Sequence, residues 1–443
     1  MSRIITFLKN RQVIFRGSAI LSSMTLLSYL IGLLRDRMLA HTFGASTSLD
    51  AYKAAFVMPD LLLNIFVAGA MTAAFVPIIT ELRERGDHAS SRDFINSVLN
   101  SSTSILLLTG VAVFVFARPL SNLIVPGFDE PGRLLFIHMT RLLLLSPIIF
   151  SISNLFGNLL VSEQRYFWYG FSAVLYNVGI IVGILFLTPS MGILGVAWGA
   201  IIGALMHFIV RAIHFGHVIR GYRPRIRLSG DYLKFLRIML PKLFGHPTEQ
   251  LINLGFTTIS STLGVGAIAI LGFARNFQSM PINVIGISFA LTAFPVLSRA
   301  AAQRNKQDFW KEIVSNSKII LLLTILAALA TYGLRFFVIR FFLGTGAFTP
   351  EDVRATAIML GLFSLSIPTE SMNHLLARGF YALKNSYIPV LLSLGGLTIA
   401  LTLGYYLSRT HGIYGLPIGF FVGSGTEMIA LFLLLRRFKE KYF

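Results

Sequence analysis

The amino-acid sequence predicts an all-α integral membrane protein, in which about twelve transmembrane helices form two parallel-related six-helix lobes around a central cavity. Three observations predict this fold class. The composition is too apolar for a water-soluble surface, and apolar stretches of membrane-spanning length follow one another along the chain. In addition, glycine and proline motifs of the first half recur in the second half at a nearly constant offset.

The composition is that of a membrane protein. Of the 443 residues, 55% are hydrophobic and 13% are charged, and the mean hydropathy is +0.72. A soluble globular protein carries about 25% charged residues, so this chain lacks the polar surface that water requires. Lysine and arginine outnumber the acidic residues by 38 to 19. They lie in short loops between apolar stretches, which argues against nucleic-acid binding. No cysteine is present, which excludes disulfides and thiolate metal sites.

Apolar stretches long enough to cross a membrane fill nearly the whole chain. A helix needs about 20 apolar residues to cross the hydrocarbon layer. The predicted spans are 15–41, 50–80, 93–117, 134–162, 167–188, 192–217, 231–262, 265–298, 309–342, 351–380, 387–408 and 412–436. Several exceed about 25 residues, which predicts tilted, kinked or extended helices. No small-residue cleavage site follows the first stretch, so we expect a retained span and not a signal peptide.

Basic residues divide the chain and orient it. A basic linker from Arg220 to Arg227 separates spans six and seven, which predicts an N-terminal lobe at 1–220 and a C-terminal lobe at 221–443. Lysine and arginine occupy both terminal segments and the loops after even-numbered spans, whereas loops 41–49, 190–192 and 344–351 contain none. Because short cytoplasmic loops carry the excess of Lys and Arg, both termini are predicted to lie in the cytoplasm.

An internal repeat relates the two halves. Four glycines of span six recur with the same spacing in span twelve, namely Gly192, Gly195, Gly199 and Gly203 against Gly412, Gly415, Gly419 and Gly423. Six spans per repeat give both halves the same orientation, related by an axis along the membrane normal. Glycines four residues apart leave one helix face bare, which favours close packing inside each lobe over homodimerisation.

Ionisable residues inside the spans are the candidate functional residues. A charge at the bilayer centre costs about 2.5–3.5 kcal/mol, so it should face a polar cavity or a partner. The clusters lie in spans one, two, seven and eight, and comprise Arg35, Asp36, Asp50, Lys53, Lys242, Glu249, Arg275 and Asn276. If the repeats face each other, the four cations predict a site for an anion such as a pyrophosphate, because guanidinium offers forked donors to phosphate oxygens.

Internal pairing is the alternative interpretation, with even weight for any single residue. Arg35 would then pair with Asp36 or Asp50, and Lys242 with Glu249. Pairing or packing within a lobe is the preferred role for the remaining intramembrane acids, which are Asp60, Glu370 and Glu427.

Other motifs exclude several activities. His207 and His214 share a helix face, but no carboxylate or cysteine completes a metal set, so we expect them at the membrane interface. The chain has no phosphate-loop motif for ATP hydrolysis and no G-x-S-x-G or H-E-x-x-H element. We therefore expect neither an enzyme nor a bound cofactor.

Short segments along the chain match a known pattern. They are Ser22-Ser-Met-Thr25, Gly32-Leu-Leu-Arg35-Asp36, Phe43-Gly-Ala45, Asp50-Ala51, Ala74-Phe-Val-Pro77, Gly346-Ala-Phe-Thr349 and Ala377-Arg-Gly-Phe-Tyr-Ala382. In these segments the sequence resembles the MurJ (MviN-type) lipid II flippases of the multidrug/oligosaccharidyl-lipid/polysaccharide exporter (MOP) superfamily. The resemblance covers nearly the whole chain and is most specific in about its first eighty residues.

The resemblance implies two six-helix lobes that form a V around a cavity open alternately to each side of the membrane. It implies transport of lipid II, the undecaprenyl-pyrophosphate-linked peptidoglycan precursor, from the cytoplasmic to the outer leaflet. Arg35 and Asp50 match family positions tied to the cavity and to function, and Asp36 completes the family's Arg-Asp pair.

The sequence also departs from the family pattern. The family usually has an arginine near Asn64 and a glutamate near Ala68, and an Asp-Arg pair where this chain has Arg275-Asn276. Lys53 and Lys242 are hypothesised to restore part of the lost positive charge. Many members carry two further C-terminal helices thought to hold the lipid tail, and the printed sequence stops after the twelfth span.

The first functional hypothesis is a lipid II flippase of the bacterial cytoplasmic membrane. It would work by alternating access, with an ion gradient or the membrane potential resetting it through Asp36, Asp50 or Glu249. The alternatives are an exporter of another lipid-linked saccharide, a multidrug antiporter of the same superfamily, and a non-transporting scaffold of a cell-wall synthesis complex. The expected partners are a lipid-linked glycan, membrane lipids, a coupling ion and cell-wall synthases, and no nucleic acid.

Overall fold

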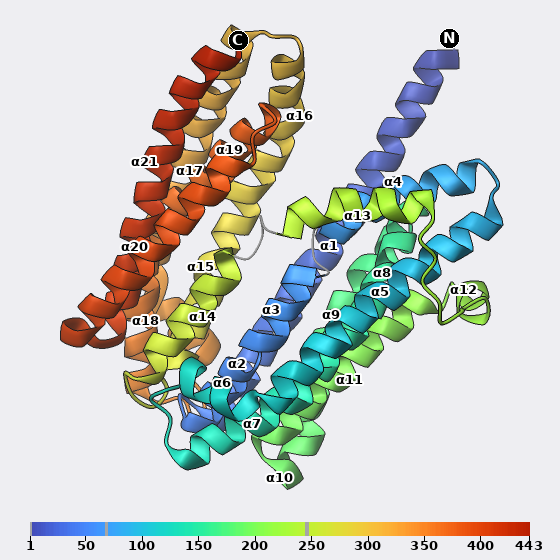
Figure 1. Ribbon diagram of the computed structural model, residues 1–443. Coiled ribbons are helices and arrows are strands. Elements are labelled where there is room, and N and C mark those ends of the chain that lie inside the picture. Colours follow the sequence, from blue (N-terminus) through green and yellow to red (C-terminus); the bar gives the residue numbers. More distant parts are fainter. Residues whose placement is uncertain (1, 67–69, 244–247) are drawn as a thin grey trace. The chain divides into compact units, whose positions relative to one another are not determined.

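Figure 1 shows the computed structural model of the protein, which describes residues 2–66, 70–243 and 248–443. Within these ranges the structure is almost entirely helical and has no β-strand. The helices of the first half are α1 (Ser2–Phe43), α2 (Thr47–Ala55), α3 (Val57–Phe66), α4 (Ala70–Glu84), α5 (His88–Val115), α6 (Ala117–Ile124), α7 (Glu130–Leu143), α8 (Leu145–Ser162), α9 (Tyr166–Val182), η1 (Gly183–Leu187), α10 (Thr188–Met191), α11 (Ile193–Ala212) and α12 (Gly216–Arg220). Those of the second half are α13 (Gly230–Leu243), α14 (Thr248–Ser261), α15 (Ala267–Pro281), η2 (Ile282–Ile287), α16 (Ser288–Ala302), α17 (Lys306–Leu343), α18 (Pro350–Ser364), α19 (Ile367–Ala382), α20 (Tyr387–His411), η3 (Gly412–Tyr414) and α21 (Gly415–Tyr442).

The predicted spans correspond to single helices or to consecutive helices of the described residues. Eight helical segments in these residues are long and apolar enough to cross a membrane, and the last of them, Tyr387–Glu440, contains both α20 and α21. The second, seventh and tenth predicted spans are not among the eight, because each consists of helices of at most 16 residues. A turn at Phe56 interrupts the second span, and a turn at Leu365 and Ser366 interrupts the tenth, so kinks are present in two of the spans whose length predicted them. The junction between the two helices of the seventh span lies outside the described residues.

A proline and a glycine accompany the irregular helical turn between α15 and α16. Proline cannot donate the backbone hydrogen bond of a helix interior. Pro281 is the last residue of α15, and the helix continues from it into the π-helical turn η2. Within η2, a Cβ on Gly286 would lie 2.6 Å from Ser371 Oγ, so only glycine allows α19 to approach this closely. Such π-helical turns are frequent at functional sites.

Backbone geometry agrees with the predicted internal repeat. Gly192 precedes α11 and Gly412 opens the turn before α21, and both residues have φ +57°. Their ψ angles are −140° and −142°. Glycine is the residue that adopts such a conformation without steric strain. The two halves therefore share this turn in conformation as well as in sequence.

The two glycine stripes pack within their own halves. A Cβ on Gly199 of α11 would lie 2.7 Å from the Cα of Gly183, the residue that follows α9. A Cβ on Gly419 of α21 would lie 2.5 Å from the backbone nitrogen of Gly404 in α20. Bare glycine faces allow such close backbone approach. The prediction of packing inside each half is confirmed at these positions.

The chain forms two compact units. Unit 1 consists of Met1–Leu39, Ala54–Leu123 and Asp129–Gln250, and unit 2 consists of Ala40–Lys53, Ile124–Phe128 and Leu251–Phe443. In unit 1 the core contains Phe75 and Phe94, whose ring centroids lie 5.2 Å apart. In unit 2 the core contains Phe309 and Phe380, both fully buried. The lobes predicted at 1–220 and 221–443 stay a prediction, since neither unit is continuous in sequence.

Two short segments of the first half belong to unit 2. The backbone N–H of Ala347 donates to the carbonyl of His41 over 2.8 Å, and the N–H of Gly127 donates to Ser261 Oγ over 3.3 Å. The first segment, Ala40–Lys53, contains the end of α1, the loop after it and most of α2, and the second is Ile124–Phe128. This exchange places Asp50 and Lys53 among the residues of the second half.

Candidate functional site

In unit 1, Arg35 and Asp36 of α1 form an ion pair. Nη2 of Arg35 lies 2.7 Å from Asp36 Oδ1, and its Nε donates to the same oxygen over 3.0 Å. The Asp36 side chain is 4% exposed and that of Arg35 is 23% exposed. A buried carboxylate needs such a partner, because an unpaired charge is strongly disfavoured away from water. Of the two predicted pairings of Arg35, the one with Asp36 is present.

Asn177 completes this cluster from α9. Nη1 of Arg35 donates to Asn177 Oδ1 over 2.7 Å, and the amide of Asn177 donates to Ser28 Oγ over 3.2 Å. The amide therefore holds the guanidinium in place and ties α9 to α1. Sequence reasoning missed Asn177, although an asparagine inside an apolar stretch was a usable signal.

In unit 2, Asp50 of α2 caps the N-terminus of a distant helix. Its carboxylate accepts hydrogen bonds from the backbone N–H groups of Gly266 and Ala269, each over 2.7 Å. These N–H groups belong to the first turn of α15, where the helix dipole favours a negative charge. Gly266 has φ +83°, and a Cβ there would lie 2.6 Å from the carbonyl oxygen of Ala45. Asp50 therefore fixes α2 against α15.

Lys53 lies one turn further along α2 and also packs on α15. Its Nζ lies 4.0 Å from the ring centroid of Phe273, a cation–π contact. The same nitrogen lies 3.1 Å from the point that a Cβ on Gly272 would occupy, so glycine makes room for it. Asp50 and Lys53 thus contact successive turns of the same helix.

Arg275 of α15 belongs to a buried network with α18, α19 and α21. Its Nη1 lies 3.6 Å from Glu370 Oε2 and donates to Gln278 Oε1 over 3.1 Å. The amide of Gln278 donates to Glu370 Oε2 over 3.0 Å and to Ser366 Oγ over 3.1 Å. The guanidinium also lies over the Phe420 ring, 4.5 Å from its centroid. The preferred pairing role of Glu370 is therefore present, and Gln278 is a member that the sequence did not reveal.

Three further residues were predicted for the site, namely Asn276, Glu249 and Lys242. Asn276 is exposed on α15. Glu249 is exposed in the first turn of α14, at the helix end that favours an acidic residue. Lys242 lies in α13, but its side chain is outside the described part of the chain, as are residues 244–247. The predicted pairing of Lys242 with Glu249 stays a prediction.

His207 is buried within the protein, and its predicted place at the membrane interface stays a prediction. His207 is 6% exposed in unit 1, and its Nδ1 lies 2.7 Å from Ser153 Oγ. One turn further along α11, the buried guanidinium of Arg211 donates to Ser172 Oγ over 2.8 Å and to Asn154 Oδ1 over 2.9 Å. These serine and asparagine partners provide the hydrogen bonds that a buried ring and guanidinium require. Among the described residues, no group of three His, Cys, Asp or Glu could hold a metal ion.

The fold is similar to that of solved membrane transporters. A lipid II flippase MurJ in an inward closed conformation matches with a TM-score of 0.80 and 23% identity, over 94% of this chain and 87% of that one. An inward-facing multidrug resistance MATE family transporter of the MOP superfamily matches with a TM-score of 0.76 and 17% identity, over 96% and 98% of the two chains. The protein therefore has the fold of a MOP superfamily transporter.

Sequence comparisons define the family. The family model described as "Lipid II flippase MurJ" matches residues 39–443. The lipid II flippase MurJ of Burkholderia cenocepacia is 27% identical over 439 residues, covering 96% of this chain and 84% of that protein. A probable lipid II flippase MurJ of Buchnera aphidicola subsp. Schizaphis graminum is 30% identical, covering 86% and 74% of the two chains. The chain belongs to the MurJ lipid II flippase family, a family of multi-pass transporters of the bacterial inner membrane.

Proposed function

We propose that this protein is a flippase that moves lipid II across the bacterial cytoplasmic membrane by alternating access. The observation that carries the proposal is membership of the MurJ family over residues 39–443. The charge pattern supports it, since cationic residues lie inside membrane-spanning segments in both units. A pyrophosphate-linked lipid is an anionic substrate that such cations would bind.

The substrate-binding residues of this proposal are the predicted set, in which Arg35 and Arg275 have the leading role. Each guanidinium is partly exposed, at 23% and 15%, and each has a carboxylate neighbour, Asp36 and Glu370 respectively. We propose that pyrophosphate oxygens take the place of these carboxylates during transport. The displaced carboxylate then needs a proton or another cation to neutralise it, and we propose that the coupling ion binds there.

The structure refines the roles proposed for the acidic residues. Asp50 receives two backbone N–H bonds, which supports a fixed anchoring role and speaks against reversible ion binding. Asp36 and Glu370 have guanidinium partners that a phosphate can also bind. We therefore favour Asp36 and Glu370 over Asp50 and Glu249 as the residues that respond to substrate.

We also propose that both termini lie in the cytoplasm. The loops after odd-numbered spans at 41–49, 190–192 and 344–351 contain no Lys or Arg, whereas the linker from Arg220 to Arg227 contains four arginines. The excess of basic residues in short loops marks the cytoplasmic side.

A multidrug antiporter is the second candidate, because a MATE transporter shares the fold with a TM-score of 0.76. Cationic drugs require an acidic binding site, and the intramembrane charges of Arg35, Lys53 and Arg275 are basic. This chemistry favours an anionic substrate.

Depletion and rescue tests the proposal. The protein is expressed in a bacterium depleted of its own lipid II flippase, as wild type and as Arg35→Ala, Arg35→Lys and Arg275→Ala variants. Arg118→Ala serves as the matched control, because Arg118 is 73% exposed and its ion-pair partner among the described residues is the exposed Glu130. We expect growth with wild type and Arg118→Ala, and loss of growth with Arg35→Ala and Arg275→Ala at equal membrane abundance.

Other outcomes separate the parts of the proposal. Failure of the wild type to rescue growth, despite normal insertion, would contradict lipid II as the substrate and favour another lipid-linked glycan or a scaffold role. Rescue by both alanine variants would contradict the site assignment. Rescue by Arg35→Lys alone among the Arg35 variants would indicate that charge and not the forked guanidinium is required.

A further inference from the structure

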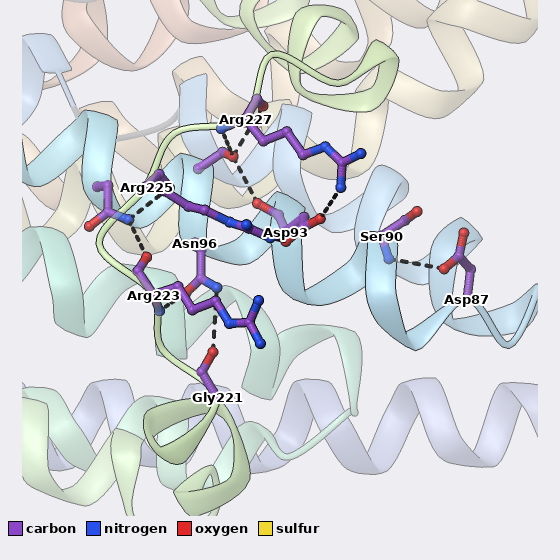
Figure 2. A network of polar contacts seen from close by, with 10 residues as sticks. Asp87, Ser90, Asp93, Asn96, Gly221, Arg223, Arg225 and Arg227 are labelled. Atoms are coloured by element: carbon purple, nitrogen blue, oxygen red, sulfur yellow. Dashed lines mark hydrogen bonds and ion pairs between the residues drawn. The ribbon is translucent and has the colours of Figure 1, made fainter.

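The linker between the two halves of the sequence follows a fixed path over α5. Figure 2 shows Arg225 and Arg227 directed at Asp93, with Nη2 of Arg225 2.9 Å from Oδ1 and Nη1 of Arg227 2.6 Å from Oδ2. One carboxylate thus binds two arginines. The Asp93 side chain is 11% exposed, whereas those of Arg225 and Arg227 are 50% and 66% exposed, so the ion pairs lie at the protein surface.

Two asparagines of α5 bind the linker backbone. The amide of Asn100 donates to the carbonyls of Arg223 and Arg225, over 2.9 and 3.1 Å, and Asn96 Oδ1 accepts the N–H of Arg223 over 3.3 Å. The Tyr222 hydroxyl donates to Asn100 Oδ1 over 2.7 Å. The linker is therefore an ordered rim on unit 1 and not a loose connection.

A cavity of about 350 Å³ lies directly beside this rim. It is bounded by α5, α8, α11 and α12, with Leu99, Ile152, Phe156, Phe208 and Val218 among its apolar walls. The asparagines and Tyr222 line its mouth, where their polar groups are already bonded to the linker. Along α5 the lining runs from Asn96 to Thr103, roughly 10 Å at 1.5 Å per residue. The volume is within the range of ligand pockets, and the walls fit a hydrocarbon chain.

The surface around the mouth has the composition of a membrane interface. Four exposed apolar residues of the linker region alternate with its arginines, namely Ile219, Tyr222, Ile226 and Leu228, which are 51%, 46%, 47% and 70% exposed. Exposed apolar residues continue along α11, where Ile209 is 57% and Ile213 is 67% exposed. Apolar side chains interleaved with arginines are typical of segments at the boundary of headgroups and acyl chains.

The mouth also carries unneutralised positive charge. Within the described part of the chain, neither Arg220 nor Arg223 makes an ion pair with a carboxylate, and both are exposed. In Figure 2 no dashed line joins the guanidinium of Arg223 to Asp93, although the Arg223 backbone is bound to α5. Arg220 and Arg223 are not lining residues themselves, but each directly follows one in the sequence, Ile219 and Tyr222 respectively. Guanidinium groups provide the donors that a lipid phosphate requires.

We propose that this cavity binds an anionic phospholipid of the cytoplasmic leaflet, with an acyl chain between α5, α8, α11 and α12 and the phosphate on Arg220 and Arg223. The side of the membrane rests on the orientation proposed above, whereas the lipid site itself is independent of the transported substrate. Charge complementarity selects the ligand class, because a basic rim attracts anionic headgroups and the zwitterionic ones only weakly.

Native mass spectrometry of the purified full chain tests this site. The protein is incubated in detergent with phosphatidylglycerol, with phosphatidylethanolamine or with inorganic phosphate, and the bound species are counted for each variant. We expect phosphatidylglycerol to bind the wild type, and its affinity to fall roughly 10- to 30-fold in an Arg220→Gln, Arg223→Gln double variant. Arg237→Gln, which changes an exposed arginine of α13 outside the cavity lining, should bind like the wild type.

A second variant tests the cavity and not the charge. Leu99→Trp fills the apolar space while it leaves all linker arginines in place. A phosphatidylglycerol with a photoreactive group in mid-chain should label α5 or α8 in the wild type and not in Leu99→Trp. Size-exclusion profiles and thermal unfolding of each variant show that a loss of binding is not a loss of folding.

Three results would overturn the proposal. They are equal phosphatidylglycerol binding by the double variant and the Arg237→Gln control, displacement of the lipid by millimolar inorganic phosphate, and displacement by an equimolar polyprenyl pyrophosphate. The second would reveal a phosphate site without a chain, and the third a site for the transported lipid. Failure of the growth rescue leaves this test intact, so the two proposals fail separately.

Discussion

The clusters in the two units handle buried charge in different ways. In unit 1 the pair Arg35 and Asp36 is contiguous in sequence, and the neutral amide of Asn177 supports it from α9. In unit 2 the charges come from distant parts of the chain, so that Asp50 reaches the backbone of α15 and Arg275 reaches Glu370. The comparison shows two roles for a buried carboxylate. Asp50 anchors one helix to another, whereas Asp36 and Glu370 neutralise arginines that, in our proposal, bind the substrate.

The largest expected effect follows from removing the anchor. Asp50→Ala leaves two N–H groups at the start of α15 without acceptors, and each bond to a charged group contributes about 1.5–3 kcal/mol. We expect a destabilisation of about 3 kcal/mol, measured as a lower thermal unfolding midpoint in detergent, and about half of that for Asp50→Asn. Glu351→Ala, at an exposed acid of α18, should change little. Equal thermal unfolding midpoints for Asp50→Ala and Glu351→Ala would contradict the anchoring role of Asp50.

A smaller effect is expected from breaking the pair in unit 1. Asp36→Ala removes the carboxylate that pairs with Arg35, whereas Asn177 still accepts a hydrogen bond from the guanidinium. A fully buried pair costs about 3–5 kcal/mol to break this way. Because the Arg35 side chain is 23% exposed, we expect about 2 kcal/mol. The double variant Arg35→Ala, Asp36→Ala should lose less than the sum of the single variants. Strict additivity would show that the two residues do not stabilise each other.

Gln278→Leu tests how much the hydrogen-bond network around Arg275 contributes to the stability of unit 2. Gln278 is fully buried and bonds Arg275, Glu370 and Ser366. Replacing its amide by an apolar group should cost about 1–2 kcal/mol, since Glu370, Arg275 and Ser366 each lose a hydrogen-bond partner. Thermal unfolding measures the loss, and Gln303→Leu at the end of α16 is the matched exposed control. An unchanged midpoint would mean that the network adds nothing to stability.

The smallest expected effect concerns the contact of Lys53 with an aromatic ring. A double-mutant cycle with Lys53→Met and Phe273→Leu should give a coupling of about 0.5–1 kcal/mol, the usual range for a cation–π contact that is not fully desolvated. The cycle separates this coupling from the packing that Phe273 loses against Phe348, whose ring lies 5.7 Å away. A coupling indistinguishable from zero would contradict the contact.

Much of the fold could be predicted from local patterns. Apolar length identified the spans, and the paired glycine stripes predicted packing that the structure shows between α9 and α11 and between α20 and α21. The interruptions in spans two and ten, at Phe56 and at Leu365 and Ser366, were harder to predict, because hydropathy averages over the residues at which a helix breaks. Proline, as at Pro281, gave a partial signal for one irregularity in α15 and η2.

The site was less predictable, because its partners lie far apart in sequence. The Arg35–Asp36 pair is local and was foreseen as one of two pairings. The role of Asp50 depends on backbone groups of Gly266 and Ala269, which no pattern of side chains reveals. Asn177 and Gln278 were not predicted, because neither lies next to a charged residue in the sequence, although buried neutral amides also need partners.

Transport in proteoliposomes tests the central claim most directly. Fluorescent lipid II is incorporated into vesicles with wild type, Arg35→Ala, Arg275→Ala or the control Arg118→Ala, and its exposure to an impermeant quencher is followed over time. We predict transport with the wild type and the control, and loss of transport with both arginine variants at equal reconstitution. Transport that persists in both arginine variants would contradict the proposed role of these two residues, and a wild type that moves no lipid II would contradict the proposed function.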